Sequence, residues 1–250
     1  AYISNIERLS SHPDVKCIIS VDAKTNFSQF SSEPLFGEVH LDPRINVDWG
    51  HYSQVLATVS LMQKSLDYKY DYFSFLSGDD IFVSTIEKFS SFLDRHKGID
   101  FIDVNVSPFD KATIYRRCAY EYTTSDFNRK KNLFEAGRDY LRREYFLKLK
   151  PRSLEISVLP VLAKGSNWFT VTRAFVREFL SFYDKNSTEL ENFFKNSLCS
   201  DEILFQSFAA SCRFERTSSN IKAFGSGDER TLRYVDWNTG PSYPKFLNYL

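Results

Sequence analysis

The sequence predicts an α/β fold with a mixed, mostly parallel central sheet flanked by helices. Short runs of strand-forming residues alternate with longer runs whose apolar residues recur at helical spacing, a pattern that favours parallel strands joined by helices. The 250 residues, of which 42% are hydrophobic and 16% aromatic, are enough to fill one large core. One apolar strand ends abruptly in Ser77-Gly78-Asp79-Asp80, as strands that lead into a binding site do.

The first part of the chain contains most of the predicted elements. Residues 3–9 have the pattern of the end of a helix. A helix over 53–66 is predicted because Val55, Val59 and Met62 recur at helical spacing. The other elements predicted here are a helix over 85–93 and strands over 15–21, 37–41, 72–76 and 99–104.

Between residues 107 and 150 the alternation breaks down into a basic, tyrosine-rich stretch. Basic residues interleaved with aromatics can indicate nucleic-acid binding. Acidic residues are interspersed here, however, so a solvated helix face or a substrate-binding insertion is favoured. Beyond this stretch the pattern predicts a short β-like run, a helix over 174–183, a polar helix around 189–195 and a helix that starts near residue 200.

Composition excludes several classes of function. The 32 basic and 32 acidic residues cancel, so net charge recruits neither nucleic acid nor an anionic membrane. The 4 cysteines lie far apart without a CxxC pair, which argues against a zinc site. No run of about 18 apolar residues is present, so no transmembrane segment is predicted in this chain.

Two acidic motifs are candidates for chemistry. Gly78 would let a ligand approach the backbone closely, and the carboxylates of Asp79 and Asp80 would meet it, although Gly and Asp also form ordinary turns. In the second half, Ser200 or Asp201 can cap a helix, with Glu202 in its first turn. Taken alone, this second motif is explained by helix capping.

Six short motifs nevertheless occur in a recognisable order. They are Val21-Asp22, the stretch from Val47 to Ser53, the stretch from Asp71 to Asp80, Gly165-Ser166-Asn167-Trp168-Phe169, Ser200-Asp201-Glu202 and the stretch from Leu232 to Trp237. Together they resemble glycosyltransferase family 14 over nearly the whole chain. That family holds the core-2 and I-branching β-1,6-N-acetylglucosaminyltransferases and the peptide O-xylosyltransferases, with bacterial relatives.

The resemblance implies a GT-A-type fold and an inverting transfer from a UDP-sugar, foremost UDP-N-acetylglucosamine, to a glycan hydroxyl. Inversion by a single displacement needs one base to take the acceptor proton, which typically accelerates a reaction by about 10²–10⁴-fold. The base of the family is the Glu of its Asp-Glu motif, which corresponds to Glu202. A position at a helix start would keep this carboxylate ionised.

Other site residues follow from the same resemblance. The residues expected at the donor are Ile19, Asp22, Trp49, Gly50, Ser77, Gly78, Asp80, Gly165, Ser166 and Asn167. Those expected at the acceptor are Trp168, Asp201 and Trp237. For each Trp, packing in the core is an equal alternative to contact with sugar.

The chain departs from the family pattern at both ends and at the strand-end motif. Asp80 is followed by Ile81-Phe82, whereas relatives often have Pro two residues after the acid, and Asp79 stands where many relatives carry an uncharged residue. We expect no cofactor besides the donor, but this double acid keeps open a Mg²⁺ or Mn²⁺ site at Asp79 and Asp80. We further expect a single domain over residues 1–250 that lacks the first strand and the C-terminal diphosphate-binding segment of the family. The cations for the leaving group are then expected either beyond this fragment or among Lys222, Arg230 and Arg233.

Three hypotheses therefore remain for the function. The first is a metal-independent UDP-sugar transferase acting on a glycan or glycolipid, the second a metal-dependent transferase with another UDP-sugar donor, and the third an inactive carbohydrate-binding domain. Nucleic acid is not expected as a partner. The few cysteines and the lack of an anchor in this sequence favour a bacterial enzyme in the cytoplasm beside the inner membrane, with the Golgi lumen as the alternative.

Overall fold

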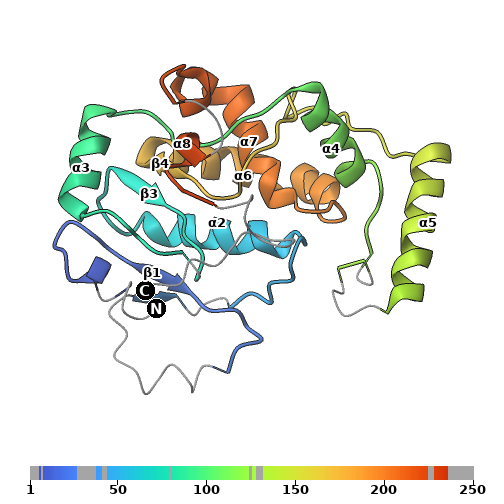
Figure 1. Ribbon diagram of the computed structural model, residues 1–250, viewed down its shortest axis with the longest axis horizontal. Coiled ribbons are helices and arrows are strands. Elements are labelled where there is room, and N and C mark those ends of the chain that lie inside the picture. Colours follow the sequence, from blue (N-terminus) through green and yellow to red (C-terminus); the bar gives the residue numbers. More distant parts are fainter. Residues whose placement is uncertain are drawn as a thin grey trace.

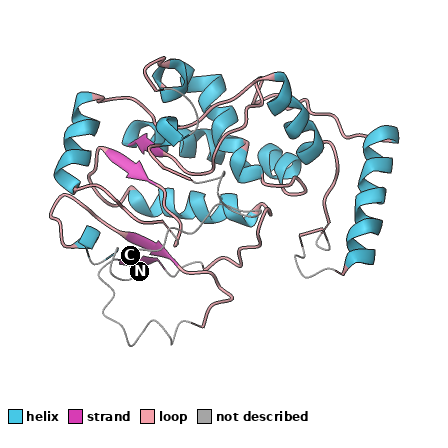
Figure 2. Ribbon diagram, in the orientation of Figure 1, coloured by secondary structure: helices cyan, strands magenta, loops and turns pink. Residues whose placement is uncertain are grey.

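The computed structural model shows a mixed α/β fold and describes residues 6, 8–26, 38–40, 44–78, 80–123, 126–127, 132–224 and 228–235 (Figures 1 and 2). Among these, residues 6 and 8–10 are helical, as the sequence predicts for 3–9. The α-helices in the described part of the chain include α2 (Ser53–Ser65), α3 (Ile86–Arg95), α4 (Pro108–Cys118), α5 (Leu133–Leu149), α6 (Arg173–Phe194), α7 (Leu204–Phe208) and α8 (Asp228–Thr231).

Within the described residues the strands form two separate pairs rather than the predicted mostly parallel central sheet. Strand β1 (Ile18–Ser20) pairs in parallel with β2 (Glu38–His40), and β3 (Tyr72–Ser74) pairs antiparallel with β4 (Thr170–Thr172). The residues predicted as a strand over 99–104 lie beside β4 through one isolated antiparallel bridge, between Phe101 and Thr170, while Asp100 forms a parallel bridge with Thr217. Strand-forming patterns locate strands but not their directions, and antiparallel neighbours need no crossover helix.

The stretch 107–150, where the sequence shows no clear pattern, contains two helices. Helix α4 begins at Ser107, whose side chain accepts a hydrogen bond from the Asp110 backbone, and Pro108 occupies the first turn. Helix α5 begins with a capping box between Asn132 and Glu135. Good capping residues are therefore the signals of these two helices, because neither buries a regular apolar face.

Helix α6 is one continuous helix where the sequence predicts two. The polar turn around 184–189 reaches solvent, so it breaks the apolar pattern without breaking the backbone hydrogen bonds. Thr172 caps the helix by accepting from the Phe175 backbone at 3.1 Å.

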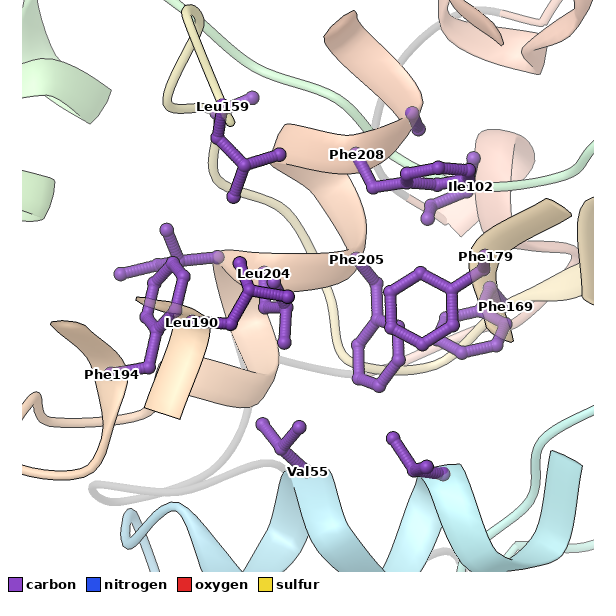
Figure 3. Packing of buried hydrophobic residues seen from close by; sticks show 14 of the residues in the cluster. Val55, Ile102, Leu159, Phe169, Phe179, Leu190, Phe194, Leu204, Phe205 and Phe208 are labelled. Atoms are coloured by element: carbon purple, nitrogen blue, oxygen red, sulfur yellow. The ribbon is translucent and has the colours of Figure 1, made fainter. Parts of the chain in front are cut away.

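The core lies between α2, α6 and α7 and is rich in phenylalanine. In Figure 3, Val55 on α2 points toward Phe205 on α7, and Phe169 and Phe179 close the same space. Rings of Phe179 and Phe205 lie 4.8 Å apart at 44°. Burying each such ring stabilises the fold by about 1.5–3 kcal/mol, so this cluster fixes the position of α7 and of the residues just before it.

A buried ion cluster ties β4 to the segment that follows α7. The Arg213 side chain is 3% exposed and donates to Asp100 at 2.9 Å and to Glu178 at 2.6 Å. Asp100 also accepts from the backbone and hydroxyl of Thr172 at 2.9 and 2.7 Å. Because each carboxylate oxygen of Asp100 has partners, the buried charges are compensated, and the β4 end cannot shift without breaking the cluster.

Candidate functional site

The two loops that carry the Trp49-Gly50 and Asp201-Glu202 motifs lie against each other. The Cys199 backbone N–H donates to the Gly50 carbonyl at 2.7 Å. Cys199 has φ 51° and Gly50 has φ 75°, and a Cβ on Gly50 would lie 2.9 Å from the Leu198 side chain. Glycine is therefore favoured at position 50, and the contact fixes the turn from which Asp201 and Glu202 project.

Glu202 presents a partly exposed carboxylate to two cations. Its Oε2 atom accepts from Arg117 Nη1 at 2.6 Å and lies 3.5 Å from Lys164 Nζ, while 28% of the side chain is exposed. The predicted helix start is a 3-10 turn, Ser200–Glu202, followed by the short α7. The positive charge that faces this carboxylate therefore comes from Arg117 and Lys164 rather than mainly from a helix dipole.

Asp201 lies in the same turn but is 3% exposed. Its Oδ2 accepts from Asn167 Nδ2 at 2.8 Å, whereas Oδ1 has no hydrogen-bond partner within the described part of the chain. Burial, with the charge of Glu202 beside it, raises the pKa of Asp201 to about 6. The predicted capping is wrong, since Cys199 occupies the cap position without a side-chain hydrogen bond and Asp201 instead holds Asn167.

The Gly165-Ser166-Asn167 turn is pressed against both acidic residues. A Cβ on Gly165 would lie 1.8 Å from the Asp103 carbonyl oxygen, so only glycine fits. The Gly165 backbone N–H donates to the Glu202 carbonyl at 3.1 Å. Gln206 on α7 donates to the Ser166 carbonyl at 2.6 Å. The structure thus joins two predicted motifs that are distant in sequence.

The strand-end motif meets the same turn through Trp168. The Trp168 ring stacks on Phe75 at 5.2 Å between centroids, and the Arg233 guanidinium lies 4.7 Å from its centroid. Arg233 also lies 3.2 Å from an Asp80 carboxylate oxygen and donates to the Phe75 carbonyl at 3.0 Å. Phe75 and Arg233 therefore hold both Asp80 and the partly buried ring of Trp168 in place.

At the end of β1, Asp22 forms a polar junction with the loop before α2. Its Oδ1 accepts from the Lys24 backbone at 2.8 Å, and Lys24 Nζ lies 2.8 Å from Asp48. Trp49, next along this loop, is 55% exposed. Ile19 on β1 is buried, so its side chain packs inward rather than facing solvent. Asp22 and Trp49 thus lie on one polar edge.

The remaining predicted site residues and the predicted metal site are not all within the described part of the chain. Asp79 and Trp237 lie outside the described residues, so their predicted roles stay predictions. Ser77 and Gly78 lie in the described loop, where the Ser77 carbonyl accepts from the Asp80 backbone at 3.3 Å. Among described residues no group of three or more His, Cys, Asp and Glu could hold a metal ion.

Sequence reasoning did not assign Arg117 or Lys164 to the site. Arg117 belongs to the basic stretch predicted to be a solvated helix face or a substrate-binding insertion, and it projects from the end of α4 to Glu202. Lys164 directly precedes the Gly165 turn and pairs through its backbone with Asn105 at 2.8 and 2.9 Å. Its position beside a recognised motif was the one available signal. The sequence carried no signal that Arg117 belongs to the site.

Comparison with known proteins identifies the family. No curated protein matches the chain. No helix in the described part of the chain is both long and apolar enough to cross a membrane. The family described as Core-2/I-Branching enzyme matches residues 2–249, nearly the whole chain. The family implies a nucleotide-sugar donor and a glycan acceptor for the chain. The two acidic residues, the glycine-dependent turn and the strand-end loop thus come together in a chain that belongs to the core-2/I-branching family of glycosyltransferases.

Proposed function

We propose that this chain is an inverting glycosyltransferase that moves a sugar, foremost N-acetylglucosamine, from a UDP-sugar to a glycan hydroxyl in a β-1,6 linkage. The observation that carries the proposal is the Glu202 carboxylate, which is partly exposed and lies where three sequence motifs of the family meet. A carboxylate at such a junction suits the general base that a single displacement requires. Bacterial cytoplasm beside the inner membrane is the compartment proposed for it.

The ion pair of Glu202 sets the first condition for this mechanism. Arg117 at 2.6 Å and Lys164 at 3.5 Å both engage the Oε2 atom of this carboxylate. An acceptor hydroxyl must therefore take a place beside the second carboxylate oxygen or displace a cation before its proton can move. Side-chain exposure of 28% leaves a route for this approach. Apo geometries of catalytic groups often tighten only when substrate binds.

Asn167 and Asp201 act in this proposal as positioning residues. Asp201 is too buried to receive a glycan without rearrangement, but it holds the Asn167 amide at 2.8 Å. Asn167 belongs to the turn proposed to line the sugar pocket. The buried carboxylate would therefore fix the pocket wall rather than touch the acceptor.

Arg233 is the proposed cation for the leaving diphosphate. It is already desolvated beside Asp80, and burial lowers the pKa of its guanidinium below the ordinary value without making it neutral. Arg230 is less available, because it lies 3.2 Å from both Asp103 and Asn105. Lys222 is exposed. An incoming diphosphate would compete with Asp80 for Arg233 and would be held in a bidentate fashion.

The deciding experiment is transfer by Glu202→Gln with UDP-N-acetylglucosamine and a glycan acceptor. We expect transfer to fall by about 10²–10⁴-fold while UDP binding changes little, because the amide keeps the shape but cannot take a proton. Glu215→Gln is the matched control, since Glu215 is exposed in the same part of the chain. Equal transfer by Glu202→Gln and wild type would contradict the proposed base.

Two alternatives have their own outcomes in the same assay. Loss of transfer in EDTA that Mn²⁺ restores would establish a metal-dependent enzyme, for which Asp79 and Asp80 are the predicted ligands. The pairing of Asp80 with Arg233 favours the metal-independent form. Absence of transfer and of donor hydrolysis with UDP-N-acetylglucosamine, UDP-glucose, UDP-galactose and UDP-xylose, with glycan binding retained, would leave the carbohydrate-binding domain.

A further inference from the structure

Helix α5 exposes a set of large apolar side chains that the site does not use. Figure 1 shows α5 at the edge of the molecule, away from the core helices. Only Asp139 and Leu147 of this helix are buried. Its large apolar residues with more than half of their surface exposed are Leu133, Phe134, Tyr140, Leu141, Tyr145 and Leu149. Such a concentration on one helix is more than the scattered exposure that is normal on protein surfaces.

Four of these side chains lie along one outward stripe. At 3.6 residues per turn, Phe134, Leu141, Tyr145 and Leu149 fall within a sector of about 80°. The two buried residues lie on the other side of the helix. The stripe runs along the outer face over most of the helix length, about 25 Å for 17 residues.

The charges on this outer face are all basic. Arg138 lies within the apolar stripe, Arg142 lies along one margin and Lys148 along the other, while the three acidic residues of α5 fall outside this sector. Arg138 is 62% exposed beside Asp139, and Arg142 is 45% exposed beside Asp126. The whole chain has no net charge, whereas this face of α5 carries basic and apolar side chains.

We propose that the outer face of α5 is a docking surface for an anionic lipid bilayer. A helix with an apolar face flanked by Lys and Arg lies in the membrane interface, with apolar side chains about 5–10 Å into the headgroup region and cations against lipid phosphates. A second copy of the chain fits less well, because a two-fold contact would set the same basic residues against each other. Nucleic acid fits less well, because it offers no partner for the aliphatic side chains.

The contacts between α5 and α4 connect this surface to the candidate site. Tyr115 on α4 donates its hydroxyl to the Leu147 carbonyl at 3.1 Å, and Arg116 forms an ion pair with Glu144. The next residue, Arg117, contacts Glu202. Docking of α5 would therefore hold the site close to the membrane surface, where a glycan carried on lipid is presented. This inference goes beyond the proposed transfer reaction and does not need it.

The test is co-sedimentation of the full chain with vesicles of phosphatidylcholine alone or mixed equally with phosphatidylglycerol. We expect binding to the anionic vesicles that weakens with salt, and little binding to phosphatidylcholine alone. The double variant Leu141→Glu/Tyr145→Glu should lose at least about tenfold in partitioning, and Lys148→Glu about fivefold. Val83→Glu and Lys97→Glu are matched controls on exposed positions away from α5.

Several outcomes would overturn the inference. It fails if the wild type does not sediment with anionic vesicles, or if the double variant and Lys148→Glu sediment as the wild type does. Light scattering serves as the second measurement. A wild-type dimer that Leu141→Glu/Tyr145→Glu converts to monomers, without vesicle binding, would assign the face to a second copy of the chain. Circular dichroism of each variant checks that α5 and the fold are retained.

Discussion

The buried carboxylate of Asp201 predicts a measurable dependence of stability on pH. Its pKa is raised from 3.8 to about 6 in the folded chain, mainly by burial. The folded state therefore holds a proton that the unfolded state has released between these two values. Stability falls as pH rises through this window, because the unfolded state binds fewer protons there. The difference of 2.2 (6 minus 3.8) corresponds to about 3 kcal/mol lost above pH 6.

The variant Asp201→Asn removes this ionisation while keeping an oxygen that accepts from Asn167. We expect its free energy of unfolding, relative to wild type, to rise between about pH 4 and pH 7.5 by up to about 3 kcal/mol. Urea denaturation at both pH values measures the difference. Asp184→Asn, on the exposed side of α6, is the control for changes that do not concern a buried group. A difference between Asp201→Asn and wild type that is the same at both pH values would refute the reasoning.

The charge of Glu202 supplies a second check on the same argument. It is the second cause of the raised pKa of Asp201. In Glu202→Gln the neighbouring negative charge is gone, so the pH-linked loss of stability at Asp201 should shrink. If burial were the only cause of the raised pKa, this pH-linked loss would be the same in Glu202→Gln as in the wild type. Comparing Asp201→Asn in the two backgrounds separates these causes, because the coupling of neighbours appears as non-additivity.

Two further predictions concern the framework around the site. Gly165→Ala should destabilise the fold by at least about 3 kcal/mol in thermal or urea denaturation, because its Cβ would lie 1.8 Å from a backbone oxygen, whereas Gly137→Ala in α5 meets nothing within 4 Å and should gain about 0.5–1 kcal/mol. A small effect of Gly165→Ala would show that the turn can move. Arg213→Ala should cost about 3–5 kcal/mol, because Asp100 is left buried and uncompensated, and exposed Arg216→Ala is its control. Equal stability of the two variants would contradict the role of the cluster.

The sequence predicted elements where apolar periodicity or strand-forming runs were strong. Helix α2 is confirmed at Ser53–Ser65 against 53–66, and β3 lies within the predicted 72–76. The sequence pattern did not reveal the helices over 107–150, because α4 and α5 bury few residues and so lack a regular buried apolar face. Strand direction was predicted only in part, because β1 and β2 pair in parallel whereas β3 and β4 pair antiparallel. Residue patterns carry no information on which strands become neighbours, and that depends on long-range packing.

For the site, the collinear motifs brought the right loops to attention but not their partners. Gly50, Gly165 and Glu202 do lie together, joined through backbone hydrogen bonds. Arg117 was missed because its role comes only from the fold, which brings the end of α4 to a residue 85 positions away. The exposed apolar face of α5 was missed for the same reason, because it too depends on the fold. Basic and aromatic residues in one stretch were predicted as a solvated helix face or a substrate-binding insertion, and only the helix register separates the buried side from the outward one.

The 3-10 turn explains why two adjacent acidic residues have such different surroundings. With three residues per turn, successive side chains point about 120° apart, so Asp201 and Glu202 cannot share one environment. Asp201 turns into the protein, where burial raises its pKa to about 6 and Asn167 occupies one oxygen. Glu202 turns toward Arg117, Lys164 and solvent. The buried carboxylate of Asp201 costs stability, but it holds the turn of Asn167 in place. That turn borders Glu202, whose carboxylate is proposed to do the chemistry.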